Sequence, residues 1–437
     1  MKVGFISLGC AKNQVNCEQM IWQTYEAGHE VALGAEDCDV AVVNTCGFLQ
    51  EARDEALSEI EKLAELKRQG RLGKIVVTGC MAQWWRDKLG EVCPDADGFV
   101  GVGGYEDIAS VIEAAAAGDR PALFGDIDAP VPETDRVVCT SDHWAWLRIA
   151  EGCDNRCAYC VIPSLRGRYR SRKMEDVIAE AESLAARGVK ELIVVAQDTS
   201  RYGIDLYRKR MLATLLRELC KIDGIRWIRV HYTYPDELTD ELIDTIAEEP
   251  KVVNYLDIPI QHVNDGILRR MNRRGNKQYL EALFPKLRAR IPGLVIRTSL
   301  IAGLPGEGEA EFEELCDFLR RHRLERAGAF PFSPEEGTPA AQMEHPEEEV
   351  ADRRAAIIAE LQAEIIDDWN AAHFDTTMEV LIDDWDGTAY IGRTYADSPG
   401  IDGTIRFTSE AEHQIGDFAT VTILGAEDGE LIGREAE

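Results

Sequence analysis

Apolar and polar residues alternate in blocks that divide the first part of the chain into strands and helices. β-prone runs occur at 2–10, 40–48 and 74–80, and each precedes a helix-competent stretch. Such strand–helix units are typical of a parallel, doubly wound sheet. Each of these strands ends in Gly-Cys or Thr-Cys, which puts a cysteine at the end of every strand. We therefore predict an α/β domain over residues 1–125.

The strand and helix pattern resumes after an acidic, proline-containing segment at 126–135, which we interpret as part of a linker over 126–138. β-prone runs follow at 144–153, 191–200, 225–235, 254–263, 294–307 and 326–334. These strands, with helical stretches between them, predict a partial TIM-like (β/α) barrel for residues 139–371, whose chemistry would lie at the carboxyl ends of its strands. A helix at 351–374 is expected to close this region.

The last region, 372–437, has a different pattern of short apolar runs separated by Gly and Asp-Gly turns. This spacing predicts a small antiparallel β-barrel. The region carries 3 Arg, no Lys and 15 acidic residues, a net charge of −12, and the whole chain has a net charge of −31. Because contacts from Lys and Arg to phosphate supply most nonspecific affinity for RNA, this charge favours a basic or neutral partner.

Composition also bears on location and cysteine chemistry. The sequence opens with no charged and apolar leader and contains no apolar stretch of about 18 residues, so we predict a cytoplasmic protein without membrane association. The chain has 12 cysteines at uneven spacing. Outside a secreted context, such cysteines favour metal or redox chemistry over a disulfide scaffold.

The central cysteines Cys153, Cys157 and Cys160 lie within eight positions of one another. A structural zinc site closes with four ligands, whereas an iron–sulfur cluster held by three cysteines leaves one iron open to a small molecule. The alternatives are buried structural thiols, or a zinc site with a distant fourth ligand. The spacing C-x3-C-x2-C, with Tyr159 before the last cysteine, resembles the radical S-adenosylmethionine (SAM) superfamily. That resemblance implies a 4Fe–4S cluster that binds SAM and, after accepting one electron, cleaves it to a 5′-deoxyadenosyl radical.

The cysteines at the ends of the first-domain strands, Cys10, Cys46 and Cys80, are distant in sequence, but loops at the same edge of a sheet meet in space. They could hold a second cluster or be ordinary buried cysteines. The phrases SLGCAKNQVNCE, VVNTCGF, VVTGC, EGCDNRCAYCVIPSLRGRYRSR and AGLPGE, in this order, resemble the methylthiotransferases. That resemblance covers nearly the whole chain. It implies two 4Fe–4S clusters, a radical SAM barrel, and a C-terminal TRAM barrel that contacts the substrate.

Within that family the target is either an adenosine of transfer RNA or the β-carbon of an aspartate in a small-subunit ribosomal protein, S twelve. SLGCAKN replaces the TYGCQMN typical of the tRNA enzymes, IPSLRG at 162–167 replaces VPYTRG, and the tail is acidic. We therefore expect the ribosomal protein to be the substrate, with the tRNA enzyme as the alternative. A third hypothesis is a noncatalytic iron–sulfur protein that binds RNA. The expected reductant is an electron donor such as flavodoxin or ferredoxin.

The supporting residues are predicted from the chemistry. An unactivated C–H bond requires a radical, so one SAM would donate the methyl group and a second would supply the radical. We expect Tyr159 to lie against adenine, Gln197, Gln261 and Arg297 to bind ribose or the methionyl carboxylate, and the Gly303 backbone to approach adenine, although each could be structural. The N-terminal domain and the tail are expected to cap the barrel mouth.

Two basic runs oppose the choice of a protein substrate. They comprise Arg166, Arg168, Arg170, Arg172 and Lys173, and Arg269, Arg270, Arg273 and Arg274. These side chains could grip phosphate, including ribosomal RNA during subunit assembly, could bind the carboxylate of the target aspartate, or could pair with acids elsewhere in the chain.

Overall fold

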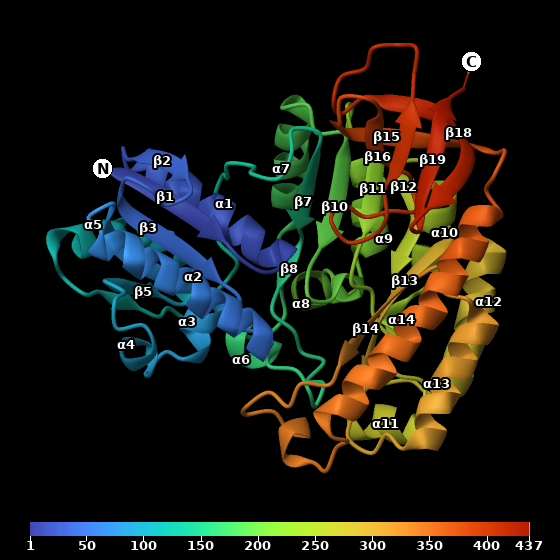
Figure 1. Ribbon diagram of the computed structural model, residues 1–437, viewed down its shortest axis with the longest axis horizontal. Coiled ribbons are helices and arrows are strands. Elements are labelled where there is room, and N and C mark those ends of the chain that lie inside the picture. Colours follow the sequence, from blue (N-terminus) through green and yellow to red (C-terminus); the bar gives the residue numbers. More distant parts are fainter. Residues whose placement is uncertain (437) are drawn as a thin grey trace.

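The computed structural model describes residues 1–436, which form the three regions seen from left to right in Figure 1. The N-terminal region is built on a parallel sheet with strand order β2-β1-β3-β4-β5-β6. Its strands are β1 (Lys2–Ser7), β2 (Glu30–Leu33), β3 (Cys38–Thr45), β4 (Leu72–Gly79), β5 (Gly98–Val100) and β6 (Ala122–Leu123).

Helices cover both faces of this sheet, which confirms the doubly wound prediction. Met20 of α1 and Ile112 of α5 pack with Val42 on one face, while Ile60 of α2 packs with Val43 and Val77 on the other. The alternating side chains of a strand point to opposite faces, so the apolar middles of β3 and β4 are buried from both sides. The helices are α1 (Ala11–Glu26), α2 (Gln50–Arg68), α3 (Cys80–Trp84), α4 (Leu89–Val92) and α5 (Ile108–Ala117).

The central region contains an open parallel sheet with order β14-β13-β12-β11-β10-β7, which confirms the partial barrel. Its strands coincide with the predicted apolar runs: β7 (Trp144–Arg148), β10 (Glu191–Val195), β11 (Trp227–Val230), β12 (Val252–Asp257), β13 (Val295–Ala302) and β14 (Arg326–Pro331). A short antiparallel pair, β8 (Ala150–Glu151) and β9 (Arg170–Ser171), flanks the loop that follows β7. The helices are α6 (Ile162–Arg166), α7 (Met174–Ala186), α8 (Ile204–Tyr207), α9 (Leu212–Cys220), α10 (Asp240–Glu248), α11 (Asp265–Arg270), α12 (Lys277–Arg290), α13 (Glu309–His322) and α14 (Glu348–Ala371).

The C-terminal region is a closed barrel with order β15-β16-β17-β19-β18, as predicted. Its strands are β15 (Thr377–Trp385), β16 (Tyr390–Arg393), β17 (Ile405–Thr408), β18 (Phe418–Glu427) and β19 (Glu430–Glu435). The pairs are antiparallel except for β17 with β19, which is parallel. Closure leaves no free sheet edge in this small region.

The tail docks at the amino ends of the central strands, so the expectation that it caps the barrel mouth is wrong. Lys190 Nζ lies 3.2 Å from Asp417, and Trp227 Nε1 donates to Glu379 at 3.1 Å. Glu191, the first residue of β10, accepts from Arg393 at 2.6 Å. The chain between β16 and β17 is buried within the central region, where Ser398 Oγ lies 2.9 Å from His231 Nε2. The tail therefore fills the barrel from the end opposite the predicted chemistry.

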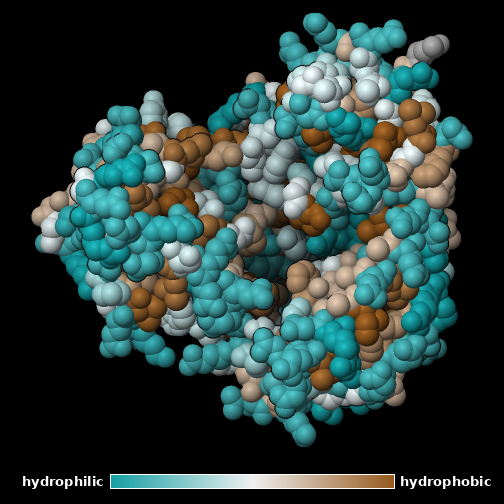
Figure 2. All heavy atoms as spheres, in the orientation of Figure 1, coloured by the Kyte–Doolittle hydropathy of each residue, from teal (hydrophilic) through white to brown (hydrophobic). Residues whose placement is uncertain are grey.

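The N-terminal region contacts the central one through α1. Val15 of α1 packs against Trp146, Ile193 and Val195, which lie on β7 and β10. Below this contact a hollow separates the two regions in the space-filling view of Figure 2. Among residues 1–436, no helix combines the length and the apolar composition needed to cross a membrane.

Candidate active site

The N-terminal cysteine triad is assembled by sheet topology. Cys10 caps the start of α1 after β1, Cys46 follows β3, and Cys80 begins α3 after β4. Because β1, β3 and β4 are neighbouring parallel strands, their carboxyl ends share one edge of the sheet. Gly9 has φ +89°, and a Cβ there would lie 2.7 Å from the Cβ of Cys46. A glycine is thus required for the Cys10 loop to lie against Cys46.

The electrostatic surroundings differ within this triad. Burial by itself would raise the pKa of the Cys10 thiol, but the cations of Lys12 and Arg166 hold that pKa below its ordinary value. Burial raises the pKa of Cys80 to about 11 even though Arg166 opposes the shift. Metal binding requires thiolates, so loading this triad would release protons into a site that already contains two cations.

The central triad lies on one loop after β8. Cys153 N donates to Gly167 O at 3.1 Å, and Cys160 N donates to Cys157 O at 3.0 Å, which fixes the curvature of the loop. Gly152 has φ +78°, and a Cβ there would lie 2.0 Å from Arg168 O. Burial raises the pKa of Cys153 to about 12.

Arg166 at the end of α6 connects the two triads. Its Nε donates to Cys80 Sγ at 3.2 Å, and its Nη1 donates to Asn16 Oδ1 at 2.7 Å and to Glu151 Oε2 at 3.1 Å. The side chain is 1% exposed. Because Glu151 lies two residues before Cys153, this guanidinium group holds the Cys80 side of one region against the Cys153 side of the other.

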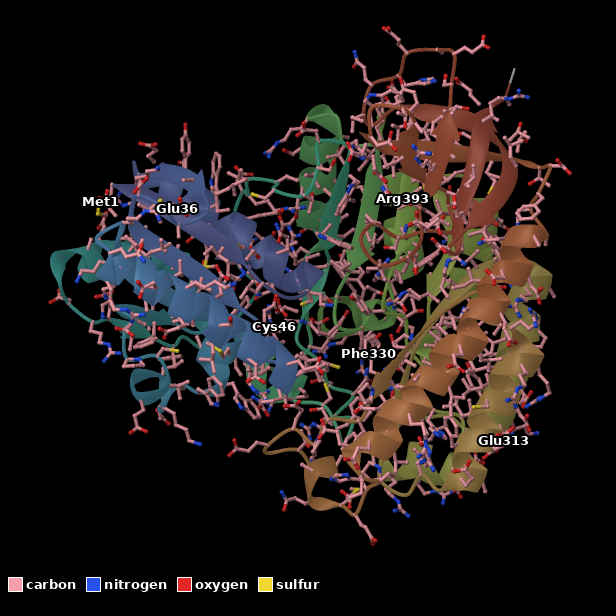
Figure 3. The ribbon with its side chains drawn as sticks, in the orientation of Figure 1. Met1, Glu36, Cys46, Glu313, Phe330 and Arg393 are labelled. Atoms are coloured by element: carbon pink, nitrogen blue, oxygen red, sulfur yellow. The ribbon has the colours of Figure 1, made fainter. Side chains whose placement is uncertain are left out.

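The segment 333–340 makes a second connection. Glu335 accepts from Arg53, whose Nη2 lies 2.6 Å away, and Arg53 Nη1 donates to Gly47 O at 3.1 Å, beside Cys46. At the other end of the segment, Ala340 N donates to Ala158 O at 2.9 Å, inside the central triad. In the view of Figure 3, Cys46 lies at the edge of the N-terminal region that faces the central one. Contacts made beside each triad therefore join the two regions.

The donor set fits iron–sulfur clusters better than single metal ions. All the cysteines of residues 1–436 are free thiols, and within these residues no three His, Cys, Asp or Glu side chains converge on a point that could hold one metal ion. A cluster distributes its cysteine ligands over separate irons, so its thiols need not converge. The cysteines of each triad are therefore candidate ligands of an iron–sulfur cluster.

The predicted SAM-binding residues Tyr159, Gln197 and Gln261 lie near the carboxyl ends of the central strands. Tyr159 OH accepts from Arg273 at 3.0 Å, and its own pKa is raised by burial. Gln197 Nε2 donates to Glu151, while its Oε1 is buried without a partner among residues 1–436. Gln261 has φ +68° and bridges to Leu300 of β13. An unpaired buried amide oxygen needs a donor, which a bound ligand can supply.

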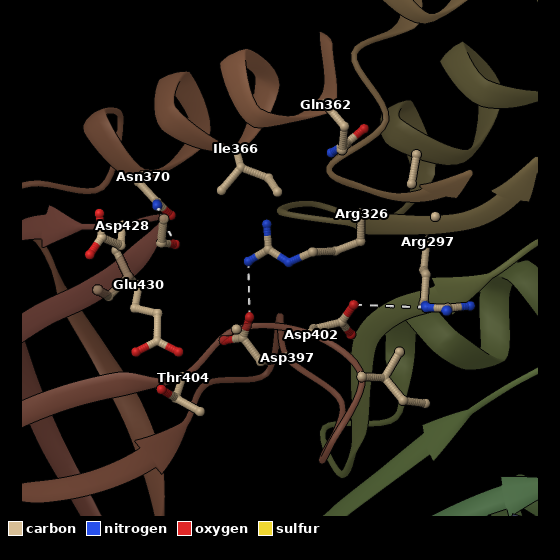
Figure 4. Close-up of a pocket in the computed structure, with 16 residues that line it drawn as sticks. Arg297, Arg326, Gln362, Ile366, Asn370, Asp397, Asp402, Thr404, Asp428 and Glu430 are labelled. Carbon is tan, nitrogen blue, oxygen red and sulfur yellow. Dashed lines mark hydrogen bonds and ion pairs between the residues drawn. The ribbon is translucent and has the colours of Figure 1, made fainter. Parts of the chain in front are cut away.

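Arg297 and Gly303 have different surroundings. Arg297 Nη1 donates to Asp257 at 3.0 Å, and its Nε lies 3.8 Å from Asp402 of the tail, beside a cavity of about 340 Å³ that Figure 4 shows. A Cβ on Gly303, which has φ +82°, would lie 2.5 Å from the Cβ of Ala351 in α14. The charge of Arg297 is thus already paired, and the glycine makes room for a helix.

Part of each basic run is used inside the protein, whereas Arg168, Arg269 and Arg270 are exposed and make no ion pair among residues 1–436. Arg166 and Arg172 are buried, and Arg172 donates to Glu133 and Glu180. Arg274 pairs with Asp236 at 3.0 Å. For these residues the alternative of pairing with acids is confirmed. Two further residues beside the triads, Glu151 and Lys12, were not predicted. Glu151 lies two positions before Cys153 and Lys12 lies two positions after Cys10, so proximity to the cysteines was the available signal.

Comparisons with known proteins agree with this arrangement. Residues 147–319 match the Radical SAM superfamily, residues 2–101 match Uncharacterized protein family UPF0004, and residues 376–435 match the TRAM domain. The radical S-adenosylmethionine methyltransferase TsrM from Kitasatospora setae, solved with cobalamin and a 4Fe–4S cluster bound, is 15% identical. It has a TM-score of 0.57, with 78% of this chain and 73% of that chain covered. This likeness shows the shared fold.

Closer relatives extend over the full chain. The ribosomal protein uS12 methylthiotransferase RimO of Symbiobacterium thermophilum is 45% identical over 443 residues, covering 100% of this chain and 91% of that protein. The RimO of Acetivibrio thermocellus is 44% identical, covering 99% of this chain and 98% of that protein. Such identity over the whole length, with both cysteine triads in place, shows that the chain belongs to the radical SAM methylthiotransferases, in the RimO family.

Proposed function

We propose that this protein is a radical SAM enzyme that methylthiolates the β-carbon of an aspartate in ribosomal protein uS12. The observation that carries the proposal is the pair of free-cysteine triads at the boundary between the two regions, whose surroundings are tied together by Arg166 and Glu335. The relatives that match over their whole length are named for this modification of uS12. A single triad would suit many radical SAM reactions, but a second triad in the same space suits the transfer of a sulfur group.

The chain's own residues hold and shield this chemistry. When bound, two 4Fe–4S clusters and SAM supply the radical and the methylthio group. In this proposal Cys153, Cys157 and Cys160 hold one cluster and Cys10, Cys46 and Cys80 hold the other. The buried contacts of Arg166 and of Arg53 with Glu335 fix the spacing between the triads, which the reaction requires because misplacement by about 1 Å is costly.

In this proposal each region has its own role. Residues 1–125 carry the second cluster, and residues 126–138 connect them to the central region. Residues 139–371 form the radical SAM region, and residues 372–437 form the TRAM region. For SAM we propose direct contacts from Tyr159, Gln197 and Gln261, with Gln197 Oε1 as a free acceptor. The contacts of Arg297 and Gly303 favour supporting roles, in which Arg297 orients Asp257 and Gly303 seats α14.

The proposed partners follow from the reaction. Radical formation needs an electron donor such as flavodoxin or ferredoxin, and a ribosomal substrate places the enzyme in the cytoplasm. Contact with ribosomal RNA during subunit assembly would use exposed arginines such as Arg168, because the buried arginines nearby are already paired. The tRNA alternative has less support, since the relatives that match nearly the full chain are named for uS12.

Mass spectrometry tests the proposal. A strain that lacks this chain should produce uS12 without the thiomethyl mass, and re-expression of the chain should restore it. Hydrolysates of tRNA from the same strains should keep their thiomethyl adenosine unchanged. A thiomethylated uS12 in the deletion strain, or loss of the tRNA modification, would refute the assignment.

A further inference from the structure

Lys12 is a buried cation at the boundary between the two regions. It is the second residue of α1, lies two positions after Cys10, and is 8% exposed. Its Nζ lies 3.7 Å from the ring centroid of Tyr232, which follows β11. The ammonium group therefore lies between the N-terminal triad and the carboxyl ends of the central strands, where the substrate must enter.

Tyr232 is itself held in an unusual conformation. Its backbone angle φ is +58°, a value that residues other than glycine rarely adopt. Its backbone N donates to Asp257 at 3.2 Å. The strained backbone presents the ring to Lys12. A cation over an aromatic face is attracted by the ring, but the ring provides no negative charge to neutralise it.

Lys12 has no carboxylate partner in the part of the chain that the structure describes, although the Cys10 thiol lies close enough to interact with its charge. Among residues 1–436, its Nζ makes no ion pair with a carboxylate, whereas Arg166 pairs with Glu151 and Arg297 pairs with Asp257. An ammonium group removed from water is costly unless an anion pairs with it. The missing anion must come either from the Cys10 site or from a bound molecule.

We propose that Lys12 binds the side-chain carboxylate of the target aspartate, an inference that rests on the proposed function. The carbon to be modified is bonded directly to that carboxyl group, so the carboxylate has to enter the same space as the reacting carbon. A lysine ammonium is a compact charge with three donors, which can hold one carboxylate. The preference of the enzyme for aspartate over its uncharged amide would then arise from Lys12.

A binding cycle tests this pairing. The anaerobic holoprotein is titrated with two labelled uS12 peptides that have Asp or Asn at the target position, in the presence of S-adenosylhomocysteine. Wild type should bind the Asp peptide about ten- to a hundredfold more tightly, as expected for a charged hydrogen bond. K12M should bind the two peptides equally, and K12R should keep most of the preference.

The matched control is K62M, because Lys62 is an exposed lysine on α2 that pairs with Glu59. It should show the wild-type preference. Iron content is measured for every variant, and K12M should retain that of wild type. An unchanged Asp preference in K12M would overturn the proposal, and so would loss of iron in K12M, since Lys12 would then serve the Cys10 site.

Failure of the proposed function has a different signature. If wild type leaves the Asp peptide without a thiomethyl group while keeping both clusters, then the substrate assignment is wrong, whatever K12M does. If wild type modifies the peptide but binds Asp and Asn peptides equally, then only the role of Lys12 is wrong.

Discussion

The two cysteine triads are built in opposite ways. The central triad occupies one short loop, whose curvature is fixed by its own backbone hydrogen bonds and by Gly152. The N-terminal triad draws Cys10, Cys46 and Cys80 from separate strand ends, so it exists only when β1, β3 and β4 are paired. A local loop can retain its ligand spacing if the fold is perturbed, whereas a triad gathered by a sheet depends on every contact that holds the sheet and its loops in place.

The largest effects should come from removing each triad. With Cys153, Cys157 and Cys160 changed to Ala, reduced protein should lose all SAM cleavage and about half of its iron. With Cys10, Cys46 and Cys80 changed to Ala, about half of the iron should be lost, but SAM cleavage should continue without methylthiolation. Iron analysis and chromatography of 5′-deoxyadenosine measure these outcomes.

The matched control for both changes is Ala at Cys93, Cys220 and Cys316, which lie away from either triad and should leave both clusters in place. If both triad variants lost SAM cleavage equally, the division of roles between the triads would be wrong.

The next effect concerns the link between the triads. Arg166→Met would remove the buried donor to Asn13 and Asn16 and one of the two arginines that pair with Glu151, and breaking a buried ion pair costs about 3–5 kcal/mol. Urea denaturation of the metal-free protein should show this loss of stability. Arg168→Met is the control, because Arg168 is exposed on the same segment and should change stability by less than about 0.5 kcal/mol. Equal effects of the two changes would mean that Arg166 does not join the regions.

A third effect depends on pH. Glu180 is partly buried, which would raise its pKa, but Arg136 of the linker and Arg172 outweigh burial and lower the pKa to about 2. A lowered pKa gives stability that is present above the ordinary value near 4.5 and is lost as the pH falls toward 2. Wild type should therefore be about 3 kcal/mol more stable than E180Q at pH 5. That advantage should shrink in urea titrations at pH 4 and pH 3, and a constant difference would contradict the ion-pair explanation.

Both triads could be predicted from the sequence, but by different signals, and the contacts that join them could not. The central loop could be recognised from spacing alone, and the strand ends of the N-terminal triad followed from the topology of parallel sheets. The short strands β2, β5 and β6 were missed because they carry only two to four residues and a weak apolar signal. The roles of Arg166 and Glu335 could not be predicted, because their partners lie up to 282 residues away and sequence does not reveal burial.

The smallest effect tests how closely the N-terminal triad is packed. Gly9 and Gly28 have nearly the same φ, +89° and +84°, but a Cβ on Gly9 would lie 2.7 Å from Cys46, whereas a Cβ on Gly28 would meet nothing within 4 Å. Alanine at either position is strained by the left-handed backbone. The difference in stability between the two variants therefore isolates the contact with Cys46. G9A should be about 1–2 kcal/mol less stable than G28A in urea denaturation. It should also retain less iron than G28A while still cleaving SAM, because the crowding displaces a cysteine of the N-terminal triad alone. Equal stability and equal iron in the two variants would show that the Cys10 loop can move away from Cys46, and that the triad gathered by the sheet is as tolerant as the triad carried on one loop.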